Sequence, residues 1–270
     1  VAYTRYIASA EPPAIIGELR VQSLNDDLTA HADVASAATQ PLHSNRGLAN
    51  RGFQLFGAGF ILLPSEAERL LAADSGHGDI VRPYRNGKDL TDRPRRVSVL
   101  DFGLRNEEEA RRYPILYDIV RDRVKPERDT NNREVRRRNW WKFGEPNPKL
   151  RRMLAGLSRY IVTVETAKHR FFTFLDSDVA PDNMLVCIAT DDAFVLGALS
   201  SSIHVQWALA AGGSLEDKPR YNKTLCFDSF PFPDGSPQAR QRIGSLANRI
   251  ELHRRRALDQ NAFATVTGMY

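Results

Sequence analysis

The chain has 270 residues, of which 42% are hydrophobic and 26% are charged, a composition typical of a folded globular domain. No apolar run approaches the roughly 18 residues that a membrane-spanning helix needs, and no signal peptide is visible at the start. The two cysteines, Cys187 and Cys226, are too few for a disulfide framework or a four-cysteine zinc site. We therefore expect a cytoplasmic protein with no membrane partner. Because the chain begins at Val1 and not at Met, we also expect a fragment of something longer.

The positive charge is concentrated in one segment. The net charge of the whole chain is +5, yet residues 128–159 carry ten Lys and Arg against three Asp and Glu, a local charge of +7. A basic segment in a near-neutral chain is typical of a surface that binds a polyanion. The alternative is a solvated surface whose cations are paired with carboxylates.

The first 45 residues are predicted to be the terminal hairpin and linker of an upstream domain. Residues 1–8 and 14–21 have the pattern of two short strands, separated by a turn at Pro12 and Pro13. Neither strand can bury both of its faces alone, so we expect their sheet to continue in residues before Val1. Residues 31–50 are small and polar and are predicted to be a linker.

Residues 46–235 are predicted to form a second domain of mixed strands and helices. Strands are expected at 53–62, 81–84 and 97–102, a helix over 66–73 capped by Ser65, and a helix capped by Asn106 that runs toward Val124 and ends at Pro126. The strongest β pattern is a hairpin of strands 160–164 and 171–175. It is followed by strands at 184–190 and 193–199 and a helix from Ser201 or Ser202 to Ala211.

Residues 236–270 are predicted to be a C-terminal helix that starts at Ser236 and Pro237. Its apolar stripe is expected to be Ile243, Leu246 and Ile250. The opposite face carries the cations Arg240, Arg242, Arg249 and Arg254. Together the elements predict an α+β fold, a mixed or antiparallel twisted sheet with flanking helices, followed by this helical segment.

Residues that could carry chemistry are sparse. The glycines of Phe56-Gly57-Ala58-Gly59 are similar to those of a nucleotide or S-adenosylmethionine loop, but they lead into a strand and not into a helix that could bind an anion. No histidine forms a spaced pair with Cys, Asp or Glu suited to a metal, and no nucleophile elbow, P-loop or Asn-Pro-Pro-Tyr occurs. We therefore predict no catalytic residue, no metal site and no cofactor site in this chain.

Two basic clusters are the better candidates for binding. Arg136, Arg137 and Arg138 precede Trp140, Trp141 and Lys142, and Arg is suited to phosphate because its planar fork donates to two oxygens. The tryptophans could stack on bases, although core packing is the more common role of such a pair. The trio Lys168, His169 and Arg170 lies at the predicted hairpin tip, where it could contact base edges in a major groove or be a plain polar turn.

Several segments together resemble one family. They are residues 56–62 (FGAGFIL), 64–67 (PSEA), 82–90 (RPYRNGKDL), 101–103 (DFG), 138–146 (RNWWKFGEP), 168–170 (KHR), 202–209 (SIHVQWAL) and 220–233 (RYNKTLCFDSFPFP). In this order and spacing they resemble the target recognition domain of class I S-adenosylmethionine-dependent DNA methyltransferases, of the MmeI-like type IIL/IIG restriction–modification family. The resemblance runs from about residue 14 to past residue 235.

The resemblance implies a function. The parent enzyme would methylate adenine N6 in double-stranded DNA after flipping the base, with S-adenosylmethionine bound by an upstream methyltransferase domain of the same polypeptide. In that family the segment matching residues 167–170 helps to choose the bases, so Lys168, His169 and Arg170 are the expected base-reading residues. The expected phosphate contacts are Arg136, Arg137, Arg138, Lys142, Arg151, Arg152, Asn222 and Lys223.

Two other functions are open from the sequence. One is a self-contained enzyme that binds S-adenosylmethionine at the loop of Gly57 and Gly59. The other is a protein-interaction subunit whose basic face meets an acidic partner.

Overall fold

The computed structural model describes residues 14–16, 19–21, 37–215, 218–261 and 263–270. The strand predicted at 1–8 lies outside the described residues. The single strand predicted over 14–21 is instead two strands, β1 (Ala14–Ile16) and β2 (Leu19–Val21), which pair antiparallel with Ala14 opposite Val21.

The linker predicted over 31–50 is partly structured where it is described. The short helix η1 (His43–Asn45) and the start of β3 (Ala49–Arg51) lie in it. Asn45 is buried, and its Nδ2 donates to the carbonyls of Phe227 at 3.1 Å and Phe230 at 2.7 Å. A polar side chain is buried at little cost when it finds such partners, so the described part of this segment packs against the fold, and the domain boundary near residue 45 stays a prediction.

The centre of the molecule is a four-stranded antiparallel sheet. Its order is β3, β10 (Leu185–Ile188), β7 (Arg159–Val164), β8 (Thr173–Asp176), which confirms the predicted hairpin of β7 and β8. Both central strands are covered on both faces. Alternate residues of β7 therefore enter two different cores, with Tyr160 and Val162 in one and Ile161 in the other.

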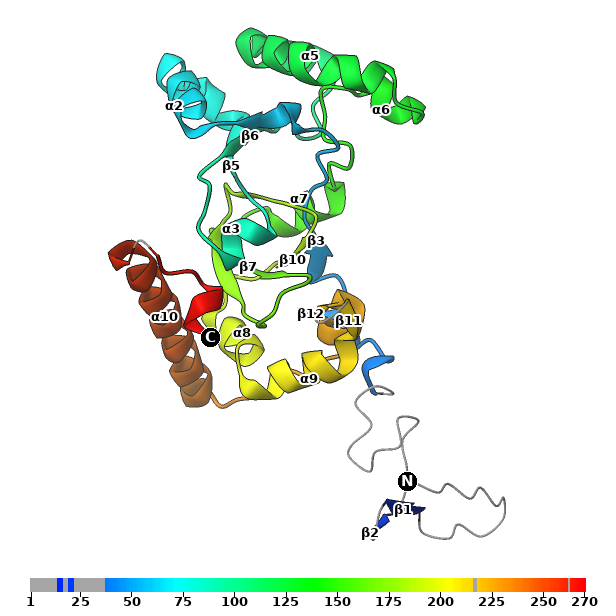
Figure 1. The fold of residues 1–270 in the computed structure, drawn as a ribbon, viewed down its shortest axis with the longest axis vertical. Helices are drawn as coiled ribbons and strands as arrows, with labels where there is room; N and C mark the ends of the chain where they lie inside the picture. The colour runs from blue at the N-terminus through cyan, green and yellow to red at the C-terminus, as the bar shows by residue number, and fades with distance from the viewer. Residues whose placement is uncertain (1–13, 17–18, 22–36, 216–217, 262) are drawn as a thin grey trace.

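A second four-stranded sheet lies above the first in Figure 1. Its order is β4 (Ile61–Leu62), β6 (Ser98–Leu100), β5 (Val81–Arg85), β9 (Ala180–Pro181), and only the β5–β9 pair is parallel. The surrounding elements are η2 (Ala58–Phe60), α2 (Pro64–Ala73), η3 (Ser75–Asp79), α3 (Gly87–Thr91), α4 (Glu107–Arg111), α5 (Pro114–Asp129) and α6 (Glu134–Arg138). Helix α7 (Pro148–Leu154) leads down to the first sheet.

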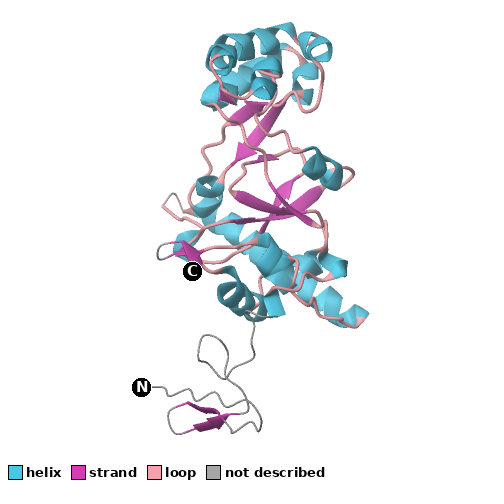
Figure 2. Cartoon of the chain, turned by 90° about the vertical axis from the view of Figure 1, so that its right-hand side faces the viewer, coloured by secondary structure: helices cyan, strands magenta, loops and turns pink. Residues whose placement is uncertain are grey.

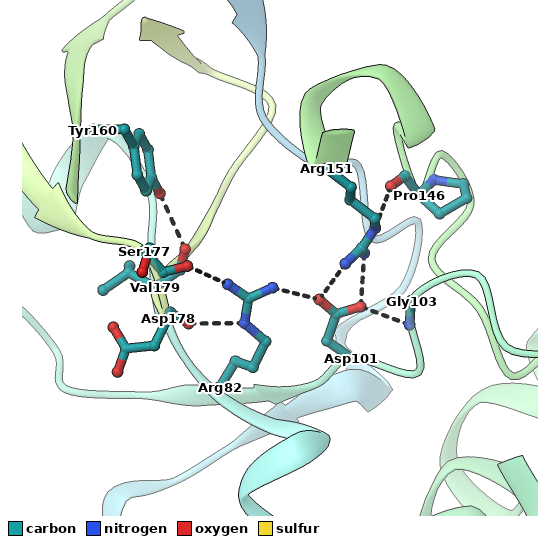
Figure 3. Close-up of polar contacts among 9 residues, drawn as sticks. All are labelled: Arg82, Asp101, Gly103, Pro146, Arg151, Tyr160, Ser177, Asp178 and Val179. Carbon is teal, nitrogen blue, oxygen red and sulfur yellow. Dashed lines mark hydrogen bonds and ion pairs between the residues drawn. The ribbon is translucent and has the colours of Figure 1, made fainter. Parts of the chain in front are cut away.

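Arg82 of β5 joins the two sheets. Its guanidinium donates to the carbonyl of Ser177 at 2.7 Å and to that of Asp178 at 2.8 Å, in the turn between β8 and β9 (Figure 3). It also contacts the buried carboxylate of Asp101 at 3.3 Å. Tyr160 of β7 donates to Val179 of the same turn at 3.0 Å. This network fixes one sheet against the other.

Several predicted elements need correction. The strand over 53–62 is reduced to β4, since Phe56 and Gly57 have φ angles of 48° and 131° that end an extended segment. Ser65 does not cap α2, which begins at Pro64. The helix predicted after Asn106 is split into α4 and α5. Pro114 starts α5, and Pro126 lies within that helix and does not end it.

The region after β10 is more helical than predicted. Residues 193–199 form α8 (Ala193–Leu199) and not a strand, because Asp192 accepts from the backbone of Phe194 at 2.8 Å and caps the helix. Helix α9 (Ser202–Gly212) is confirmed, with Ser201 as its cap. Then follow β11 (Ser214–Leu215), β12 (Lys218–Pro219), the π-helical turn η4 (Lys223–Phe227), α10 (Pro237–Gln260) and η5 (Thr267–Met269).

The face that α10 buries differs from the predicted apolar stripe. Leu246 and Ile250 are 46% and 43% exposed, whereas Gly244, Ala247, Glu251 and Arg254 are buried. Small residues allow α10 to lie close to α8. The polar residues Glu251 and Arg254 form hydrogen bonds with the edge strand β8 and the residue before it. Glu251 accepts from the hydroxyl of Thr173 at 2.6 Å, and Arg254 donates to the carbonyl of Phe172 at 2.7 Å.

The α+β class with mixed and antiparallel sheets and flanking helices is confirmed, as Figure 2 also shows. In the part of the chain that the structure describes, no single helix could cross a membrane. The pair α8 and α9, bent by 59°, passes the same test by length and composition.

Candidate nucleic-acid interface

The basic segment 128–159 divides into packed cations and surface cations. Five of its ten cations are held against the protein's own rings: Arg128, Arg136, Lys142, Arg151 and Arg159, over Phe60, Phe56, Trp141, Phe53 and Phe174. The remaining five are exposed: Arg133, Arg137, Arg138, Lys149 and Arg152. The local charge of +7 therefore overstates what the segment offers to a partner.

Arg136 is the first of two predicted phosphate contacts on α6 and α7 whose side chains are largely buried. Its guanidinium carbon lies 3.4 Å from the ring centre of Phe56, and the group reaches Glu145 at 3.9 Å. Only 11% of this side chain is exposed. Arg136 therefore fixes the irregular segment around Phe56, and we no longer assign it to a phosphate.

Arg151 is the second. It donates to both carboxylate oxygens of Asp101, at 2.9 and 2.7 Å, and to the carbonyl of Pro146 at 2.8 Å (Figure 3). Since Asp101 also accepts from the backbone of Gly103, the carboxylate is fully satisfied. Arg151 ties α7 to the second sheet and has no donor fork left for a ligand, so its predicted role at a phosphate is corrected.

The other predicted phosphate contacts from Arg137 to Arg152, which lie on α6, on α7 and in the segment between them, keep donors for a ligand. Arg138 is largely exposed and makes a 3.7 Å pair with Glu134, while Arg137 and Lys142 each donate to one carbonyl, of Asn131 at 2.5 Å and of Leu104 at 3.1 Å. Partial burial lowers the pKa of Lys142. Arg152 is exposed, and no described residue holds its side chain by a hydrogen bond or ion pair.

Trp140 and Trp141 are core residues, as the more common role of such a pair indicated. Both are buried and contact each other edge to face with centroids 5.9 Å apart. The indole of Trp141 donates to the carbonyl of Arg105 at 3.1 Å. Trp140 also packs against Tyr117 of α5, with centroids 5.1 Å apart, so the two rings hold the chain after α6 in the core and are not positioned to stack on bases.

The loop predicted to contact bases presents its three residues differently. Lys168 is exposed, and His169 is half-buried with its ring stacked 6.1 Å from that of Tyr270. Arg170 is buried and donates to Thr163 Oγ1 at 3.0 Å, to the carbonyl of Pro219 at 3.1 Å and to that of Val164.

Burial lowers the pKa of Arg170, and the side chain lies 5.0 Å over the ring of Tyr221. The prediction that Arg170 lies at an exposed tip is therefore incorrect. Its long side chain turns inward to backbone carbonyls of β7 and β12. We no longer assign Arg170 to base contacts. Lys168 and His169 keep that assignment as a prediction.

Asn222 and Lys223 lie at the start of η4. The side chain of Asn222 caps this turn by accepting from Thr224 at 3.0 Å, and Lys223 pairs with Asp228 at 2.7 Å. Both side chains thus have structural partners, and their contact with phosphate stays a prediction.

Sequence reasoning missed a cluster around Glu165. This carboxylate is 4% exposed and accepts from two arginines, Arg51 at the end of β3 and Arg220 after β12. The three residues are separated by 114 and 55 positions along the chain, so no local pattern could reveal them. Arg220 does fall within the segment 220–233 that carried the resemblance.

The glycine loop is used for packing. A Cβ at Gly59 would lie 2.7 Å from the carbonyl oxygen of Arg123 in α5, and one at Gly57 would lie 3.1 Å from the carboxylate of Glu127. The glycines therefore let α5 approach this loop closely. This close contact leaves no room between the loop and α5 for a nucleotide. It counts against the alternative in which the chain is an enzyme that binds S-adenosylmethionine at this loop.

The remaining surface cations follow one side of the molecule. Figure 1 shows α6, α7, β3 and β12 along this side, opposite α2 and α10. Helix α10 also carries exposed arginines, at Arg242, Arg249, Arg255 and Arg256, so positive charge is not confined to one side of the molecule. The concentration of cations in one segment is typical of a polyanion-binding module.

Comparisons with known proteins define the chain further. The family model described as "MmeI, target recognition domain" matches residues 31–234. This match covers well over half of the chain, so the chain belongs to the family of MmeI target recognition domains.

Two known proteins are similar to this chain in fold or in part of its sequence. A solved structure of the type IIL restriction–modification enzyme MmeI in complex with DNA has a TM-score of 0.69 and 18% identity, over 97% of this chain and 34% of that chain. DNA methyltransferase A of Bacillus subtilis (strain 168) is 28% identical over 86 residues, which is 31% of this chain and 10% of the relative. The chain thus spans about a third of one relative and a tenth of the other.

Proposed function

We propose that this chain recognises a specific sequence in double-stranded DNA, as the target recognition domain of a larger DNA methyltransferase of a restriction–modification system. The family match over residues 31–234 carries this proposal. The surface cations of α6 and α7 support it, because a DNA clamp needs cations that its own fold does not consume.

The proposal divides the work between two regions. Arg137, Arg138, Lys142 and Arg152 would contact phosphates, which position the duplex without specifying its sequence. Lys168 and His169 would contact base edges, where each well-placed contact discriminates by about 1–3 kcal/mol. The two regions lie on different elements, so affinity and sequence preference are separable by mutation.

The parent enzyme would supply the chemistry. We propose that an upstream domain of the same polypeptide binds S-adenosylmethionine and methylates adenine N6 in the cytoplasm, and that the target base is flipped for the reaction. This chain would contribute no catalytic group. Calorimetry with S-adenosylmethionine tests this division, since binding heat from the chain alone would contradict it.

The direct test is binding of a fluorescent DNA duplex by the chain, measured by anisotropy over a salt series. We expect the logarithm of affinity to fall linearly with the logarithm of salt concentration, with a slope of several units. Absence of binding at low salt would overturn the proposal. Equal competition by heparin and duplex would instead favour a protein-interaction subunit with a basic face.

A further inference from the structure

The charges around Glu165 do not balance. One buried carboxylate accepts from two guanidinium groups, and both groups approach the same oxygen, Oε1, at 2.6 Å. Arg51 and Arg220 are nevertheless 52% and 45% exposed along their side chains. A net positive charge thus remains at the surface, carried by two groups that one small anion can reach together.

Both arginines keep donors that Glu165 does not use. Arg51 contacts the carboxylate through Nη2 alone, at 2.6 and 2.7 Å, which leaves Nε and Nη1. Arg220 contacts it through Nε at 2.8 Å and Nη2 at 2.6 Å, which leaves Nη1. The described residues provide no other acceptor for these remaining donors, so they are directed to a ligand or to solvent.

The backbone of each residue in the cluster is held by pairing with a neighbouring segment. Arg51 is paired with Val186 in β3 and β10, and Arg220 is bridged to Thr166 next to β7. The amide of Glu165 donates to the carbonyl of Met184 at 2.9 Å. Because three backbones are fixed and the carboxylate orients both guanidiniums, an anion would bind with little loss of side-chain freedom.

The cluster connects the two regions assigned to DNA. Asn147, which caps α7, donates to the carbonyl of Arg51 at 2.7 Å, so the cluster lies beside the helix that carries Lys149 and Arg152. On its other side, the amide of Ala167 reaches the carbonyl of Pro219 at 3.5 Å, which brings the neighbourhood of Lys168 to that of Arg220.

We propose that Arg51 and Arg220 together bind one phosphate of the DNA backbone, and that Glu165 is the positioning residue that holds them for it. This inference rests on the proposed function and deepens it, because it names a phosphate contact between the cations of α7 and the base-reading loop. The bound phosphate would neutralise the charge that Glu165 leaves unpaired.

Glu165→Gln gives the decisive test, because an effect of overall charge and an effect of positioning by Glu165 change the affinity for the duplex in opposite directions. The substitution adds one positive charge to the surface, so a contribution from overall charge alone predicts tighter duplex binding. Positioning predicts weaker binding, by about tenfold at fixed salt, since both guanidiniums lose their charged anchor. Tighter binding by Glu165→Gln would overturn the proposal.

The arginines are tested in the same anisotropy assay. Arg51→Ala and Arg220→Ala are each expected to lower the salt slope by about one unit. The double variant should fall little further, because both serve one phosphate. Arg220→Lys keeps the charge but cannot hold Glu165 and a phosphate with one ammonium group, so it should also bind more weakly.

Controls separate this inference from the proposed function. Arg69→Ala removes an exposed arginine of α2, on the opposite side in Figure 1, and should leave slope and affinity unchanged. Thermal unfolding of each variant checks that it is folded. If Glu165→Gln does not fold, Arg220→Lys takes its place as the test of positioning. No binding by the unmodified chain would overturn both proposals. Binding with unchanged slopes in the arginine variants would overturn this one alone.

Discussion

Arg151 and Asp101 form a two-pronged ion pair in which the carboxylate is almost completely buried. The pair links α7, in the most basic part of the sequence, to the end of β6 in the second sheet (Figure 3). A cation in a basic segment of a DNA-binding domain can therefore be part of the scaffold and not of the interface. Its neighbour Arg152 is exposed and forms no such pair among the described residues, so substitutions of the two arginines can be compared directly.

Arg151→Met is expected to destabilise the fold by about 3–5 kcal/mol, because it removes one partner of a buried pair and leaves Asp101 with the 3.3 Å contact to Arg82 and the amide of Gly103. Urea unfolding followed by circular dichroism measures this loss. A variant as stable as the unmodified chain would show that solvent replaces the guanidinium at Asp101, and that the pair does not join α7 to the sheet.

Arg152→Ala is expected to leave stability within about 0.5 kcal/mol, because the side chain is exposed. It should instead lower the salt slope of duplex binding by about one unit if it contacts a phosphate. Anisotropy over the salt series checks this outcome. A slope equal to that of the unmodified chain would remove Arg152 from the interface.

Arg170→Ala and Lys168→Ala form a second contrast within one loop. Arg170 is buried and holds carbonyls of β7 and β12, so its removal leaves acceptors unpaired and should cost about 1–3 kcal/mol of folding free energy. Lys168→Ala should preserve stability and change sequence preference. Unfolding measurements, together with selection of bound duplexes from a random pool, separate the two effects. An unchanged preference in Lys168→Ala would contradict its assignment to bases.

The sequence predicts those elements whose signals are local. The hairpin of β7 and β8 shows a run of β-branched and aromatic residues, and α9 has a serine cap at one end and glycines at the other. The strand predicted at 193–199 fails for a local reason as well. A short apolar segment such as Ala193–Leu199 is compatible with strand or helix, and the cap at Asp192 decides for helix.

Long-range relationships explain the rest. Glu251 and Arg254 are polar residues on the buried face of α10 because the edge of β8 offers backbone groups there, which the sequence of α10 alone cannot reveal. The same holds for Glu165, whose two arginine partners are distant in the chain. Composition identified the basic segment, but only packing distinguishes Arg151 from Arg152.

Gly59→Ala tests whether the glycine loop is a packing device. The new Cβ would lie 2.7 Å from the carbonyl oxygen of Arg123 and 2.8 Å from a methyl group of Val124, so α5 must move. We expect a loss of about 1–3 kcal/mol. Gly78→Ala is the matched control, because nothing lies within 4 Å of its Cβ position. Equal stabilities in urea unfolding would contradict the close packing.

The last prediction concerns His204, which is buried in α9 with its Nε2 2.9 Å from the hydroxyl of Tyr221. Burial, with a smaller contribution from Arg170, lowers the pKa of this imidazole from 6.5 to about 3. At a pH between these two values, His204 therefore binds a proton in the unfolded chain but not in the folded chain. Stability is therefore complete above pH 6.5 and falls as the pH decreases toward 3.

His204→Gln isolates this contribution, because an amide can still reach Tyr221 but does not titrate. Urea unfolding is compared between about pH 7 and about pH 5. Below the pKa of the unfolded histidine, the free energy of unfolding of the unmodified chain should fall by up to about 1.4 kcal/mol per pH unit more than that of the variant. Urea unfolding of both proteins at several pH values measures the difference in slope. The slopes are compared and not the absolute stabilities, since the ring also packs 4.3 Å from that of Phe230 and its loss weakens the core at every pH. Parallel pH profiles would mean that His204 accepts a proton in the folded state, which would require the helix α9 to open at this position.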